Sequence, residues 1–204
     1  MKDVVVVVKS VNYSEADKVL TVFGKELGKF ALFAKGIRKI NSKNRGNMQT
    51  LCISEISFYE GKGLPVLTES SLVYAPNTDV LKGRVENLKR VLVMLNRILA
   101  EYDRNEKVFD MLKSVLEKDF STEATNRFRV IFLKEMGFLD DFSKCSKCGD
   151  KVKLEYIDVL HFALLCKNCY SNSGKCVALG KNPYREDFFS EALDMYVKRV
   201  IEEI

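Results

Sequence analysis

Four cysteines in the last third of the chain have the spacing of a metal site. They are Cys145, Cys148, Cys166 and Cys169, which form two C-x2-C pairs separated by seventeen residues. Each pair lets two thiolates face one ion at about 2.3 Å, and two pairs complete the tetrahedron of a structural zinc site. Iron in a rubredoxin-like site takes the same ligands. We therefore expect one structural Zn²⁺, with iron as the alternative.

The other residue types argue against catalysis. His161 is the only histidine, and a structural role is favoured for it. The chain has no P-loop, no G-x-G-x-x-G after a strand and no H-E-x-x-H. Four thiolates also leave no open position on a metal for water or substrate. We expect no catalytic residue, and we expect Cys52 and Cys176 to be small, half-buried apolar residues.

A second cluster of chemistry is electrostatic. The whole chain carries a net charge of only +5, but residues 24–47 contain seven basic residues against one acid, Glu26. The basic residues are Lys25, Lys29, Lys35, Arg38, Lys39, Lys43 and Arg45. A local basic stretch in a nearly balanced chain indicates an anionic partner. The alternative is a solvated surface loop.

The first 76 residues have the pattern of strands. Five short runs rich in β-branched and aromatic residues occupy 4–8, 18–23, 29–34, 51–60 and 64–74. In the fourth run the apolar alternation changes phase between Ile53 and Ile56, as a β-bulge would require. Five short strands predict a small closed barrel, because closure removes exposed edges. The polar segment 42–46 predicts a loop between the third and fourth strands.

From Pro76 onward the apolar residues recur at helical spacing. Leu81 to Tyr102 predicts one long helix. Further helices are expected over 106–118, over 122–136 with Gly137 as its C-cap, and from about residue 186. The prediction is an α+β multidomain protein: a barrel at 1–76, then an α-helical domain at 77–204 that carries an inserted zinc-ribbon-like module at about 141–176.

Composition places the chain in a broad class. It is 47% hydrophobic and 30% charged, which is typical of a globular protein. No apolar run approaches the ~20 residues of a membrane span. We expect a cytoplasmic protein with no membrane partner, in a compartment where thiols stay reduced and bind metal.

Several segments together resemble one known family. They are Tyr13–Asp17, Phe23–Lys29, Ala34–Lys39 and Ser42-Lys43, followed by Gly137-Phe138 and by Cys145-x-x-Cys148-Gly149 paired with Cys166-x-x-Cys169. In this order they resemble the RecO family of bacterial recombination mediators. The motifs are loose individually, and their order and spacing carry the resemblance.

The resemblance implies a fold and a function. It implies an N-terminal OB fold, a helical C-terminal domain and an inserted zinc module. It implies binding of single- and double-stranded DNA, annealing of complementary strands, and loading of recombinase onto DNA covered by single-strand-binding protein. The implied partners are RecR, the C-terminal tail of the single-strand-binding protein and, indirectly, the RecA recombinase. The implied location is the cytoplasm, in association with the nucleoid.

The residues themselves suggest how DNA would be held. Lys35, Arg38, Lys39, Lys43 and Arg45, together with Lys25 and Lys29, would contact phosphates along the barrel. Tyr13, Phe30 and Phe33 are candidates for stacking on bases. Phe30 and Phe33 lie an odd number of residues apart, so at most one of them faces outward on a regular strand. The alternative is a zinc-ribbon interaction adaptor with little DNA affinity, whose barrel binds protein.

Overall fold

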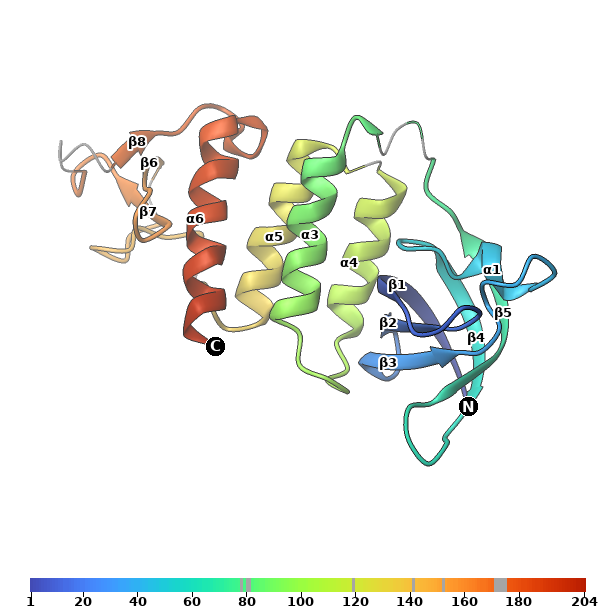
Figure 1. Cartoon of the computed structure of the whole chain (residues 1–204). Coiled ribbons are helices and arrows are strands. Elements are labelled where there is room, and N and C mark those ends of the chain that lie inside the picture. Colours follow the sequence, from blue (N-terminus) through green and yellow to red (C-terminus); the bar gives the residue numbers. More distant parts are fainter. Residues whose placement is uncertain (78, 80–81, 119, 141, 152, 171–175) are drawn as a thin grey trace. The chain divides into compact units, whose positions relative to one another are not determined.

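The structure is a computed structural model that describes residues 1–204 apart from 78, 80–81, 119, 141, 152 and 171–175. The chain divides into two compact units, Met1–Phe120 and Ser121–Ile204. Strands β1 to β5 and helices α1, α3 and α4 belong to the first unit, and the remaining elements belong to the second (Figure 1). In this described part of the chain, no helix is long and apolar enough to cross a membrane.

The first unit contains the predicted barrel. Its strands are β1 (Lys2–Asn12), β2 (Lys18–Gly24), β3 (Gly28–Ala34), β4 (Ile53–Tyr59) and β5 (Val66–Tyr74). They close in the order β1-β2-β3-β5-β4, with antiparallel neighbours except for a parallel β3–β5 contact. The closed barrel predicted from the strand pattern is confirmed, and with five strands it is OB-like, as the resemblance implied.

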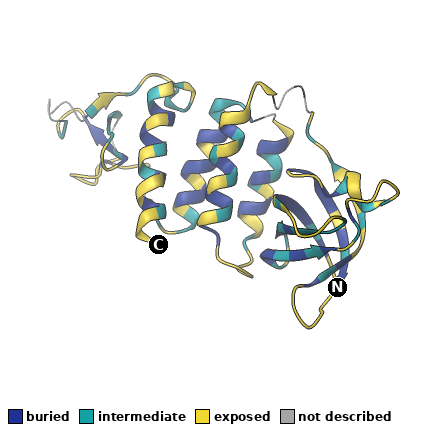
Figure 2. Cartoon of the chain, in the orientation of Figure 1, coloured by how far each residue is buried: buried dark blue, intermediate teal, exposed yellow. Residues whose placement is uncertain are grey.

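Buried apolar residues at alternate strand positions form the inside of the barrel, and Figure 2 shows the buried parts of these strands in dark blue. The fully buried members of this core are Val5, Val7, Leu20, Val22, Phe30 and Leu32. Burial of each large apolar side chain contributes about 1.5–3 kcal/mol. The phase change predicted in the fourth run is confirmed, because the β4–β5 register shifts between Ile53 and Ser54. Both residues are buried, and the Ser54 hydroxyl donates to the carbonyl oxygen of Asn47 at 2.6 Å.

Helix α3 (Val85–Arg97) is shorter than the predicted helix. Leu81, at the start of the predicted stripe, lies outside the described residues. At the other end the chain leaves the helix to pair with β3: Glu101 forms a bridge with Lys29, and the Tyr102 N–H donates to the Lys29 carbonyl oxygen at 2.8 Å. The predicted extension to Tyr102 was therefore wrong, because tertiary pairing replaced the last helical turn.

Helix α4 (Glu106–Glu117) begins at a well-formed cap, where the Asn105 side chain accepts from the Val108 N–H at 3.0 Å. The ring of Phe109 lies 5.8 Å from that of Phe23 on β2. α3 and α4 thus pack on the barrel, and the first compact unit ends after them. The predicted boundary at residue 76 marks the change from strands to helices and stays a prediction.

In the second unit, helix α5 (Thr122–Glu135) and helix α6 (Asp187–Glu203) match the predicted helices closely. Gly137 has φ +77° just after α5, which is the left-handed cap conformation expected of it. A short 3-10 helix, η1 (Pro183–Arg185), precedes α6. The buried Arg129 guanidinium on α5 pairs with Asp194 on α6 at 2.5 Å.

Candidate metal centre and nucleic-acid interface

The four predicted cysteine ligands come together. The sulfur atoms of Cys145, Cys148, Cys166 and Cys169 all lie within 4.8 Å of one another. A tetrahedral ion with Zn–S bonds of about 2.3 Å requires sulfur atoms about 3.8 Å apart. The Cys148 Sγ to Cys166 Sγ distance is 3.8 Å. The donor set and its spacing therefore fit a four-thiolate metal site.

Tight turns hold the ligands in place. The Gly149 N–H donates to the Cys145 carbonyl oxygen at 2.8 Å, and Gly149 has φ +76°. In the second pair, the N–H groups of Cys169 and Tyr170 donate to the Cys166 carbonyl oxygen at 3.1 and 3.0 Å. Positive φ favours glycine, because a side chain there meets the following carbonyl. Each turn places two sulfur atoms on one side of the backbone.

Backbone amides also favour ionised sulfur at Cys145. Burial opposes ionisation of this thiol, but hydrogen bonds from the N–H groups of Cys148, Cys166 and Lys147 outweigh it. Together they lower the pKa of Cys145 to about 6. Since the thiolate is the form that binds metal, these hydrogen bonds favour the metal-binding form of Cys145.

The apolar cluster around the cysteines is small. The module's strands β6 (Leu154–Asp158), β7 (Ala163–Cys166) and β8 (Cys176–Ala178) form a sheet in the order β7-β6-β8. The buried residues of this cluster are Cys145, Cys166 and Leu165. Cys176 is half-buried beside this cluster, while Cys52 is buried in the first unit. So small a core needs a cross-link or a metal.

His161 lies in the turn between β6 and β7. Its Nδ1 is 2.8 Å from Asp158 Oδ2, and its side chain is 72% exposed. Asp158 Oδ1 also accepts from the backbone N–H of Leu160 at 2.9 Å. The contact ties the turn together, in keeping with a structural role for this histidine.

Five of the predicted DNA-binding residues share one exposed segment. Lys35, Arg38 and Lys39 follow β3, and Lys43 and Arg45 lie at helix α1 (Asn44–Asn47), before β4. All five are exposed. We call this segment, residues 35–47, the basic loop.

The other two predicted residues lie elsewhere. Lys29 is only 8% exposed, and its Nζ donates to the carbonyl oxygen of Asn96 on α3 at 2.9 Å. Burial lowers the pKa of Lys29. Lys25 Nζ is 2.9 Å from Glu106 Oε1 and 3.8 Å from Asp110 Oδ1 on α4. Both ammonium groups are engaged within the first unit, so neither joins the exposed surface of the basic loop.

Hydrogen bonds fix the basic loop to the turn between β1 and β2. Arg38 Nη1 donates to the Ser14 carbonyl oxygen at 2.6 Å, and the Arg38 N–H donates to Ala16 at 3.0 Å. The Gly36 N–H donates to Asp17 Oδ1 at 2.7 Å. This bond, together with that from the Ser14 hydroxyl, lowers the pKa of Asp17. The carboxylate thereby positions the loop.

Helix α1 is fixed to β5 in the same manner. Asn47 Nδ2 donates to the Ser70 carbonyl oxygen at 2.8 Å, and the Ser70 hydroxyl donates to Asn44 Oδ1 at 2.9 Å. Because both asparagines bind β5, the backbone of α1, which carries Arg45, is fixed to the barrel.

One aromatic pair extends the basic surface. Tyr13 is 70% exposed, and its ring meets Phe33 edge-on with centroids 5.5 Å apart. Phe30 is fully buried in the barrel core. Only one of the two phenylalanines thus faces outward, as their odd spacing predicts. Ile40, which is 94% exposed on the basic loop, was not anticipated from the sequence.

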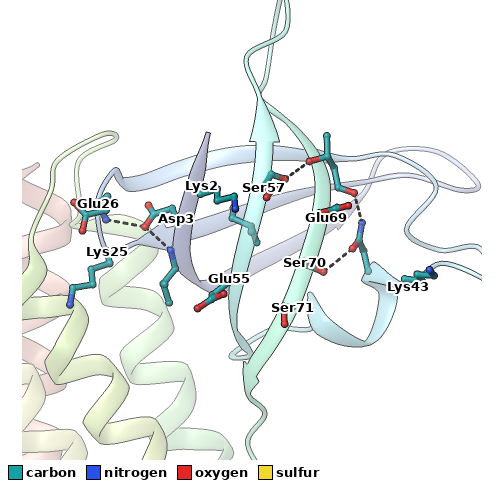
Figure 3. A pocket seen from close by; sticks show the side chains of 14 residues that line it. Lys2, Asp3, Lys25, Glu26, Lys43, Glu55, Ser57, Glu69, Ser70 and Ser71 are labelled. Atoms are coloured by element: carbon teal, nitrogen blue, oxygen red, sulfur yellow. Dashed lines mark hydrogen bonds between the residues drawn. The ribbon is translucent and has the colours of Figure 1, made fainter.

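Basic residues line two separate cavities in the described part of the first unit. The larger, of about 790 Å³, is lined by Lys25 and Lys43 at opposite ends and by acids that include Glu26, Glu55 and Glu69 (Figure 3). The smaller, of about 320 Å³, is lined by Lys18, Arg38 and Arg45. The larger cavity has mixed charge, whereas the smaller one is cationic. Lys18 lies outside the basic stretch of the sequence, so sequence reasoning missed it.

Comparison with known proteins agrees with this architecture. The family described as "Recombination protein O N terminal" matches residues 1–76, and "Recombination protein O C terminal" matches residues 91–182. A DNA repair protein RecO of Thermodesulfovibrio yellowstonii is 30% identical over 174 residues, which cover 82% of this chain and 69% of that protein. The RecO of Acetivibrio thermocellus is 28% identical over 179 residues, with the same two shares. This chain belongs to the RecO family of DNA repair proteins.

Proposed function

We propose that this chain is a DNA-binding recombination mediator whose basic loop contacts the phosphate backbone. Residues 1–76 act as the nucleic-acid-binding domain, and residues 77–204 act as the helical domain with its zinc module. The contacts are independent of base sequence, because they are made to phosphates. The protein acts by binding and positioning strands, without catalysis.

The single observation that carries the proposal is the exposed, anchored basic loop on an OB-like barrel. Its five cations are Lys35, Arg38, Lys39, Lys43 and Arg45, all exposed. OB folds commonly bind single strands with a positive groove and aromatic stacking. Tyr13 supplies such an aromatic side chain beside Ser14, whose carbonyl oxygen holds Arg38.

The same surface supports strand annealing. Two complementary strands repel each other through their phosphates, and cations that neutralise those charges lower the repulsion. In this proposal the chain anneals complementary strands and helps load RecA where single-strand-binding protein covers the DNA. Its partners are RecR and the C-terminal tail of the single-strand-binding protein, as its membership of the family suggests.

The metal has a structural role in this proposal. Cys145, Cys148, Cys166 and Cys169 hold one Zn²⁺, which cross-links the two turns of the module. A sphere filled by thiolates leaves no position for substrate.

A titration of labelled single-stranded DNA against salt, followed by fluorescence anisotropy, tests the proposal. The variant with Lys35, Arg38 and Lys39 all changed to alanine is expected to bind every sequence more weakly. The salt slope, which is the decrease in the logarithm of the binding constant per unit increase in the logarithm of salt concentration, should fall by about 0.7 per lost contact. Addition of the complementary strand then measures annealing. An unchanged slope would rule out the basic loop, and little DNA affinity in the wild type would favour a zinc-ribbon adaptor.

A further inference from the structure

The smaller cavity assembles residues that are far apart in the sequence. Asn12 ends β1 and Lys18 begins β2, where the two are cross-strand partners. Arg38 comes from the basic loop and Arg45 from α1, and Gln49 follows α1. The cavity therefore lies where the β1–β2 turn meets the segment between β3 and β4.

Its charge is entirely positive. Lys18, Arg38 and Arg45 line it together with the amides of Asn12 and Gln49, and none of its described lining residues is acidic. The Asp17 carboxylate, next to Lys18 in the chain, accepts from Gly36 and Ser14 and does not line the cavity. Gathering three cations with no acid in the lining is unfavourable, and an anion bound between them relieves the repulsion.

The floor of the cavity is apolar and fixed. Ile37 and Met48 line it, are 3% and 1% exposed, and belong to the barrel core. A floor that continues the core cannot move independently of the barrel. The three cations therefore line a cavity whose apolar residues are part of the barrel core.

The walls are held by hydrogen bonds that need no ligand. Arg38 is tied to Ser14 and Ala16, and α1 is tied to β5. The Gln49 side-chain amide donates to the carbonyl oxygen of Arg45. Such pre-organisation lowers the entropic cost of binding an anion. Guanidinium groups suit phosphate oxygens, because their N–H donors form a planar fork.

We propose that this cavity is a phosphate subsite that holds one backbone phosphate of a bound DNA strand, with Lys18 as a phosphate-binding residue. The inference rests on the proposed function and adds a residue outside the basic loop. It places the strand over the β1–β2 turn, beside the exposed ring of Tyr13.

Lys18→Met tests the subsite, because methionine keeps an unbranched apolar stem and removes the charge. With labelled single-stranded DNA, the salt slope is expected to fall by about 0.7. Lys18→Arg should retain the wild-type slope. Lys89→Met, on α3 and 64% exposed at its side chain, is the matched control and should leave the slope unchanged. Circular dichroism melts establish that each variant is folded.

The outcomes separate the subsite from the wider function. Wild-type binding with an unchanged slope in Lys18→Met overturns the subsite and leaves the basic loop in place. No DNA binding by the wild type removes both proposals together. A titration with inorganic phosphate alone, followed by NMR of the backbone N–H signals, adds a second arm. Saturation there with no effect of Lys18→Met on DNA would identify a site for free phosphate and overturn the assignment to DNA.

Discussion

Lys29 Nζ donates to the carbonyl oxygen of Asn96 at 2.9 Å, which turns a predicted phosphate contact into a link between β3 and α3. Lys29→Met should leave the salt slope of DNA binding unchanged. It should cost about 1 kcal/mol of stability, because the Asn96 oxygen loses a donor. Lys39→Met, the same change at an exposed site, should lower the slope and leave the melting temperature nearly constant. A lower salt slope in Lys29→Met would contradict this and show that Lys29 contacts DNA.

Gly28 and Gly137 provide a matched test of backbone crowding. Both have positive φ, +71° and +77°. A Cβ at Gly28 would lie 2.2 Å from the carbonyl oxygen of Asp103, whereas one at Gly137 would meet nothing within 4 Å. Gly137→Ala should cost about 1–2 kcal/mol, the price of the left-handed conformation. Gly28→Ala should cost clearly more in urea denaturation, and equal losses would contradict the crowding at Asp103.

Removal of the metal should affect the module and spare the barrel. A chelator or Cys145→Ser is expected to unfold residues around β6 to β8 locally, since structural zinc sites couple binding to folding. Amide exchange should then increase in Leu154–Asp158 and stay slow in β1 to β5. Metal analysis should give one zinc in the wild type and in Cys176→Ser, the control beside the cluster. Loss of barrel protection on chelation would contradict this independence.

Glu123 should make the second unit sensitive to acid. Hydrogen bonds from Asn182 and Arg185 outweigh burial and, with Arg127, lower the pKa of Glu123 to about 2. The salt bridge from Arg185 Nε to Glu123 Oε2 is 2.6 Å long. Because the folded pKa lies below the unfolded value of about 4.3, the stabilisation is complete above that pH and is lost between about 4 and 2.

Glu123→Gln should therefore lower the melting temperature at pH 7 and have progressively less effect as the pH falls toward 2. Thermal melts of both proteins across this range measure the difference. A gap that stays constant with pH would show that ionisation of Glu123 does not carry the effect.

The features that sequence predicted well are local. Each C-x2-C spacing lets its own two sulfur atoms approach each other, and the four sulfur atoms lie within 4.8 Å of one another. The barrel strands follow from apolar alternation, and the phase change at Ile53 marks a real register shift. The α4 and α5 helices follow from their apolar spacing and their caps. In each case the signal lies within a few residues of the feature.

The features that sequence missed depend on contacts between distant segments. Glu101 and Tyr102 left the predicted helix to pair with Lys29, more than 70 positions away in the chain. Lys25 lies in the basic stretch, yet acids on α4 neutralise it. A count of charges along a short stretch of sequence does not include acidic residues that folding places beside that stretch.

The sequence by itself determined the two cysteine pairs, the strand-rich first part and the position of the basic stretch, because short-range spacing and local charge specify them. Only the tertiary structure decided which basic residues remain available to an anion. Packing of α3 and α4 on the barrel buried Lys29 and paired Lys25 with acids on α4, and hydrogen bonds between the basic loop and the β1–β2 turn placed Lys18 in one cavity with Arg38 and Arg45. The physical reason is that burial and ion pairing change what a charge can bind, and both are set by neighbours distant in sequence.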